Sequence, residues 1–133
     1  MVTNKIHHIG IAVQKLDQAV NTYGLLGLSV SKIENVPHMG VKVAFLNIGD
    51  SRLELLEPTS NESPIARFLE KKGEGIHHIC IEVDDLKKAT KLLKSQKIQF
   101  VYDEPKPGAD HMLVNFIHPK SCHGVLLELC QTH

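Results

Sequence analysis

The chain has 133 residues, with 15 basic and 15 acidic residues and nine histidines. A chain of this length is long enough to form one domain with a substantial core. The zero net charge gives no support to a nucleic-acid or membrane-surface protein, and no long apolar run predicts a transmembrane helix. Because the first residues lack the apolar stretch of a signal peptide and the three cysteines form no Cys-x-x-Cys pair, we expect a cytoplasmic protein with reduced thiols.

The first half of the chain has the pattern of a βαβββ unit. Apolar side chains alternate at its start, as in a strand, and then recur at helical spacing from Leu16 to Tyr23. A nearby glycine is a common helix terminator. We expect, in order, a strand over 5–13, a helix from Leu16 to about Gly24 or Gly27, and strands over 28–33, 41–46 and 51–57.

A linker rich in Pro, Ser and Gly separates this half from the next. Within it, Ser63-Pro64 is typical of a helix N-cap followed by proline at the first helical position. We therefore predict module one at about 1–58, a linker with a short helix at 59–74, and module two at about 75–133. The expected elements of module two are a strand from Ile76, a helix after Asp84-Asp85, and strands over 98–102, 112–117 and 125–130.

Two nearly identical stretches begin the halves, at His7-His8-Ile9-Gly10-Ile11 and, seventy residues later, at His77-His78-Ile79-Cys80-Ile81. Strand side chains alternate between faces. His8 and His78 therefore lie opposite the isoleucines, and His7 and His77 are expected on the other face in structural roles. The repeat suggests a pseudo-twofold arrangement that brings His8 and His78 together.

The last strand of each half carries one carboxylate in its middle, Glu54 or Glu128, between apolar residues. A buried, unpaired carboxylate is costly, and a metal ion would offset that cost. We therefore predict one divalent ion per site, held by His8, Glu54, His78 and Glu128. This mixed N/O set suits Co, Ni, Mn, Zn or Fe. We expect Cys80 and Cys130, two residues beyond His78 and Glu128, to be small apolar side chains that line the pocket.

The sequence resembles the vicinal-oxygen-chelate, or glyoxalase-like, superfamily, and within it most resembles the methylmalonyl-CoA epimerases. The supporting strings lie at 54–58, 63–69, 77–83 and 118–129. The resemblance implies an α+β fold of two paired βαβββ modules that form a U-shaped mixed sheet around a divalent metal. The metal ligands it implies are again His8, Glu54, His78 and Glu128.

The resemblance also implies a metal-dependent isomerase that epimerises methylmalonyl-CoA or a related acyl-CoA through an enolate. Epimerisation needs a proton acceptor on one face of the carbanion and a donor on the other. Glu128 is the first candidate. The epimerases usually carry a glutamate where this chain has His38, two residues before Gly40, so His38 is the possible partner. Lys120 is a candidate for substrate binding.

Other activities of the superfamily stay open at this point. A lactoylglutathione lyase would use the same two-His, two-Glu set on a glutathione hemithioacetal, but these lyases typically place an arginine near Ala12. A non-catalytic small-molecule binding protein usually lacks the ligands, and a ring-cleaving dioxygenase usually shows one carboxylate and two histidines. We expect a thioester or glutathione-adduct substrate, no nucleic-acid or membrane partner, and a homodimer.

Overall fold

The computed structural model describes residues 1–132 and divides into two compact units. The first unit is residues 8–77, and the second unit is residues 1–7 together with 78–133. Each unit contains four neighbouring strands and its own apolar cluster. In the part of the chain that is described, no helix is long and apolar enough to span a membrane.

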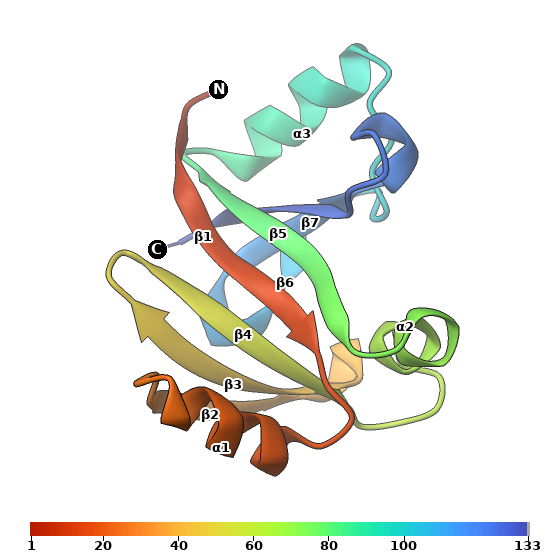
Figure 1. Ribbon diagram of the computed structural model, residues 1–133. Coiled ribbons are helices and arrows are strands. Elements are labelled where there is room, and N and C mark those ends of the chain that lie inside the picture. Colours follow the sequence, from red (N-terminus) through yellow and green to blue (C-terminus); the bar gives the residue numbers. More distant parts are fainter. Residues whose placement is uncertain (133) are drawn as a thin grey trace. The chain divides into compact units, whose positions relative to one another are not determined.

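The first unit contains a mixed sheet with strand order β2-β3-β4-β1 (Figure 1). Strand β4 pairs antiparallel with β3 and parallel with β1. Its elements are β1 (Thr3–Ala12, from His8 on), α1 (Leu16–Leu25), β2 (Val30–Val36), β3 (Val41–Ile48), β4 (Ser51–Pro58) and α2 (Pro64–Lys72), with a 3-10 turn at Pro37–Met39.

The second unit repeats this arrangement with strand order β5-β8-β7-β6. Strand β8 pairs parallel with β5 and antiparallel with β7. The elements are β5 (Gly75–Val83, from His78 on), α3 (Leu86–Ser95), β6 (Lys106–Pro107), β7 (Leu113–Ile117) and β8 (Leu127–Gln131), with 3-10 turns at Ala109–His111 and Pro119–Ser121. The α+β class and the repeated βαβββ order are therefore confirmed.

The first seven residues are tied to the end of β5. The backbone N–H of Val2 donates to the Asp84 carboxylate at 3.1 Å, and the Asp84 N–H donates to the Val2 carbonyl at 3.1 Å. The Asn4 side chain donates to Glu82 at 3.0 Å. These bonds fix the course of the chain toward His7 within the second unit.

Each helix packs on the sheet of its own unit through an apolar stripe, as the helical spacing predicted. In the first unit Leu16 of α1 joins a buried cluster with Val13, Ala44, Leu46 and Leu55. The matching cluster in the second unit consists of Val83, Leu86, Ala89, Ile117 and Leu129. Burial of these side chains contributes roughly 25 cal/mol for each Å² of apolar surface removed from water.

The helix starts follow the sequence prediction. Ser63 caps α2, since its hydroxyl accepts from the Ile65 N–H at 3.1 Å, and Asp85 caps α3 by accepting from Lys88 N–H at 3.1 Å. At the starts of α1 and α3, a side chain on the last strand of the same unit accepts a hydrogen bond from the first helical N–H. Leu16 N–H donates to Glu57 at 2.9 Å, and Leu86 N–H donates to Gln131 at 2.8 Å.

Two strand predictions need correction. The segment 98–102 forms only one isolated bridge, Phe100 with Ile117, because the Asn115 side chain bonds both the N–H and the carbonyl of Tyr102 and replaces the ladder. Strand β2 begins and ends later than the predicted 28–33, since its register with β3 shifts between Val30 and Lys32.

Candidate functional site

The first unit holds one buried imidazole–carboxylate pair. His8 on β1 and Glu54 on β4 lie on neighbouring strands, where Gly10 is the direct partner of Glu54. The atoms His8 Nδ1 and Glu54 Oε2 are 3.2 Å apart. His8 is 1% exposed and Glu54 is 3% exposed, so this pair is closed off from bulk water.

An arginine also binds the Glu54 carboxylate. Arg52 Nε donates to Glu54 Oε2 at 2.9 Å, and Nη2 of the same guanidinium lies 2.8 Å from that oxygen. The guanidinium carbon lies 4.3 Å from the centre of the Phe45 ring. Glu54 is therefore charge-compensated by this chain's own residues. Sequence reasoning missed Arg52, although its place two residues before Glu54, on the same strand face, was an available signal.

The second unit holds the matching pair. His78 Nε2 on β5 lies 3.1 Å from Glu128 Oε1 on β8, and the two residues are 6% and 5% exposed. The His78 ring meets Phe116 edge-on, with centroids 5.6 Å apart. Phe116 is the direct strand partner of Glu128, just as Phe45 is the direct partner of Glu54. The repeat seen in the sequence therefore extends to the surroundings of each carboxylate.

Tyr102 is a further side chain beside Glu128 that the sequence did not reveal. Burial, and after it the negative charge of Glu128, raise the pKa of Tyr102 above its ordinary value of 10.0. Its ring packs edge-on against Phe116 at 5.9 Å, and Lys106 Nζ lies 4.4 Å from its centroid. Tyr102 therefore stays protonated near neutral pH and keeps a hydroxyl donor next to Glu128.

His38 lies exposed in the 3-10 turn Pro37–Met39 of the first unit. The turn ends at Gly40, where φ is +66° and an added Cβ would lie 3.0 Å from the Ser63 Cβ. The Gly40 carbonyl accepts from Thr59 N–H at 2.9 Å. These contacts hold the turn that carries His38 in a defined position.

Lys120 is exposed in the 3-10 turn Pro119–Ser121 of the second unit. Its backbone N–H donates to His118 Nδ1 at 3.1 Å.

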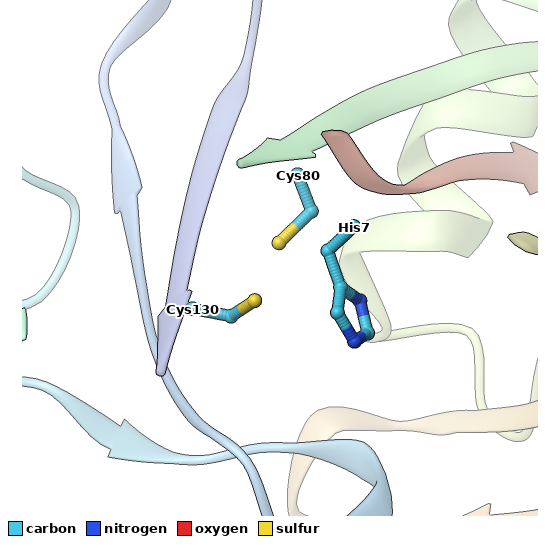
Figure 2. A group of neighbouring side chains, drawn as sticks. All are labelled: His7, Cys80 and Cys130. Atoms are coloured by element: carbon cyan, nitrogen blue, oxygen red, sulfur yellow. The ribbon is translucent and has the colours of Figure 1, made fainter. Parts of the chain in front are cut away.

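The two histidines predicted to be structural lie in different surroundings. His77 meets the Phe68 ring edge-on, with centroids 5.1 Å apart, in agreement with a packing role. His7 departs from strict strand alternation, because it is buried beside Cys80 and Cys130 (Figure 2).

The donor chemistry fits a divalent first-row ion. Each unit offers one buried imidazole and one buried carboxylate, and such N/O ligands suit these ions. Buried carboxylates beside imidazoles are also what a metal ion would stabilise by its charge.

Comparison with known proteins agrees with the fold. The profile of the Glyoxalase/Bleomycin resistance protein/Dioxygenase superfamily matches residues 7–116. The chain therefore belongs to that superfamily.

Within the superfamily the chain belongs with the methylmalonyl-CoA epimerases. It is 46% identical to the mitochondrial methylmalonyl-CoA epimerase of Homo sapiens, over 96% of this chain and 73% of that protein. It is 42% identical to the ethylmalonyl-CoA/methylmalonyl-CoA epimerase of Cereibacter sphaeroides, over 96% of this chain and 97% of that protein. A solved Streptomyces coelicolor methylmalonyl-CoA epimerase variant in complex with 2-nitronate-propionyl-CoA is 38% identical, with a TM-score of 0.96 over 98% of this chain and 96% of that one.

Proposed function

We propose that this chain is an isomerase that epimerises methylmalonyl-CoA or a closely related acyl-CoA. The observation that supports this most is the buried His–Glu pair at the matched position of each βαβββ repeat, in a chain 42–46% identical to named epimerases. The CoA ligand of the Streptomyces coelicolor structure supports a CoA thioester as the substrate class.

His8, Glu54, His78 and Glu128 are the residues proposed to hold one divalent ion, chosen from Co, Ni, Mn, Zn or Fe. When bound, such an ion polarises a carbonyl oxygen and stabilises the negative charge that develops on it. Within this set Glu54 acts as a fixed ligand, because Arg52 already binds one of its oxygens. The guanidinium also holds the carboxylate in one orientation.

Glu128 is the residue proposed to remove the proton beside the thioester carbonyl. Its neighbours in the second unit include the imidazole of His78 and the protonated Tyr102. His38 is proposed to deliver a proton to the opposite face of the carbanion, as imidazole can act as acid or base near neutral pH. Lys120 is proposed to bind the substrate, and the protein is proposed to act as a homodimer.

The experiment that tests this function follows deuterium from solvent into methylmalonyl-CoA with metal-loaded enzyme. We expect incorporation at the carbon beside the thioester carbonyl, since every turnover exchanges that proton. No incorporation would overturn the epimerase assignment. Turnover of the methylglyoxal–glutathione hemithioacetal at a higher rate than methylmalonyl-CoA would assign the chain to the lyases instead.

The role of His38 is tested in the same assay. His38→Ala is expected to lower turnover at least about a hundredfold, the lower end of the range for a positioned acid–base group, while metal content stays unchanged. His111→Ala is a matched control, since His111 is also an exposed histidine within a 3-10 turn, Ala109–His111. An almost silent His38→Ala would remove the proton-donor assignment.

A further inference from the structure

A second set of metal-ligand side chains lies within the second unit, on the strands that also carry His78 and Glu128. Figure 2 shows the His7 ring and the Cys80 and Cys130 side chains pointing toward one another. One ligand atom from each, an imidazole nitrogen and two sulfurs, lies within 4.8 Å of the others. The residues are 8%, 0% and 0% exposed, so the group is buried.

Three separate strands bring these side chains together. Cys80 is on β5 and Cys130 is on β8, while His7 arrives on β1 through the bonds that tie Val2 and Asn4 to the end of β5. On β8, Cys130 lies two residues beyond Glu128 and so on the same strand face. The cluster therefore shares a buried face of the second unit with Glu128, whose carboxylate lies within 4.8 Å of Cys80 Sγ.

The repeat shows that the fold itself does not require thiols here. Glu54 pairs with Gly10 and Glu128 pairs with Cys80, so Gly10 is the counterpart of Cys80. By the same register Leu56 is the counterpart of Cys130. The first unit thus builds the same sheet without a sulfur at either position.

The register argues against a disulfide between the two cysteines. Cys80 is opposite Glu128, and Cys130 is opposite Glu82, so the thiols are diagonal neighbours on adjacent strands. Strand spacing and rise put their Cα atoms roughly 8 Å apart. A disulfide needs less than about 7 Å without backbone movement. Two metal–sulfur bonds of about 2.3 Å reach farther, since they allow the sulfurs to lie about 3.8 Å apart.

The donor set selects the kind of ion. Glu82 is engaged by Asn4 and Thr132 at 3.0 and 3.2 Å. The Glu128 carboxylate, which lies near Cys80, pairs with His78 at 3.1 Å, so the cluster itself supplies two sulfurs and one nitrogen. We propose that His7, Cys80 and Cys130 form a second metal site for a thiophilic d10 ion such as Cu⁺ or Cd²⁺. Soft thiolate ligands prefer these ions, whereas the N and O ligands of the two His–Glu pairs suit harder ones. On binding, both thiols give up their protons to solvent.

The test titrates the full-length protein with Cd²⁺ in the presence of a phosphine reductant. Thiolate-to-cadmium charge transfer in the ultraviolet reports sulfur ligands, which the His–Glu set lacks. We expect one cadmium per chain to produce this band. Cys80→Ala and Cys130→Ala are expected to abolish it, and His7→Ala to weaken cadmium binding at least tenfold. Cys122→Ser, which alters the partly exposed cysteine outside the cluster, should keep the full band.

Circular dichroism of each variant establishes that it is folded before titration. Because Cys130 is buried, Cys130→Ser is measured beside Cys130→Ala, and agreement between folded variants is required. A band that is absent from wild type, that survives in either Cys130 variant, or that disappears in Cys122→Ser would overturn the proposal. Deuterium exchange into the acyl-CoA is measured separately, on the wild-type enzyme. Failure of this metal site and failure of the epimerase assignment are therefore separate results.

Discussion

The two units use the same imidazole–carboxylate pair but surround it differently. In the first unit Arg52 binds Glu54 and stacks on Phe45, and in the second unit His78 and Tyr102 both pack against Phe116 beside Glu128. The counterpart of Arg52, two residues before Glu128, is Leu126. The second unit thus places apolar and phenolic groups around its carboxylate at the position where the first unit has the Arg52 guanidinium.

This difference teaches which carboxylate is suited to move a proton. A carboxylate held by a guanidinium is fixed in orientation and has its charge compensated. In its own unit the Glu128 carboxylate instead lies beside the His78 imidazole and is the strand partner of Phe116. We propose a holding role for Glu54 and a proton-transfer role for Glu128, and the variants below test that division.

The largest effect is expected from Glu128→Gln. The amide still offers an oxygen to a metal but cannot accept the proton, so turnover should fall at least about a hundredfold. Glu54→Gln, measured at saturating metal, should fall about tenfold or less. Initial rates and elemental analysis of the same preparations give both readouts. Equal losses in the two variants would contradict the division of roles.

Arg52→Leu gives the first unit the residue type that the second unit has at the matching position, Leu126. It leaves the buried Glu54 with His8 and without the guanidinium, and breaking such a pair costs about 3 kcal/mol. Urea unfolding of metal-free protein measures the loss. Lys32→Leu is the control, because Lys32 also lies near Phe45, but its side chain is 47% exposed and forms a surface ion pair with Glu34. A similar loss in both would show that Arg52 acts only through its alkyl chain.

The starts of α1 and α3 offer a smaller test of the same comparison. Asp85 caps α3, whereas Lys15 at the matching place makes no side-chain cap bond. Asp85→Ala should cost about 1 kcal/mol, and Lys15→Asp should recover a similar amount in the first unit. Thermal unfolding of the two single variants and of the double variant checks this. If Lys15→Asp destabilises the protein, the Leu16–Glu57 bond already satisfies that helix start.

The smallest effect concerns Tyr102 and appears at alkaline pH. Since burial raises the pKa of Tyr102 in the folded state, the unfolded chain ionises first as pH rises above 10.0. Wild type should therefore lose stability from that pH upward, and Tyr102→Phe should lose less. Urea midpoints at neutral and alkaline pH make the comparison. Identical pH dependence in the two proteins would contradict the burial of the hydroxyl beside Glu128.

The sequence predicts well the features that occur at matching positions in both halves of the chain. The strands that carry His8 and His78 and the carboxylates Glu54 and Glu128 could be found because each has a counterpart at a matching place. Ser63 and Asp85 were predictable as helix caps because capping is a local property of the chain.

The parts that the sequence does not predict depend on contacts between distant residues. Residues 98–102 alternate like a strand, yet the Asn115 side chain takes the backbone bonds of Tyr102. The burial of His7 beside two cysteines departs from simple alternation. It depends on the bonds that tie the start of β1 to the end of β5. Tyr102 comes near Glu128 for the same reason, since no spacing along the chain links them.

The parallel pairing of the first and last strands of each repeat has a consequence for the order of folding. His8 is in register with Arg52 and Ile79 with Leu127, whereas β3 and β4 are joined by the short turn at Gly49–Asp50. Closing a long loop costs entropy before its contacts form, so the hairpin is expected to nucleate and the parallel pairs to form late. Substitutions in the hairpin should therefore slow refolding, while substitutions at His8 or His78 should mainly speed unfolding. The chemistry of this chain then becomes available only when the slowest strand pairing of each repeat is complete.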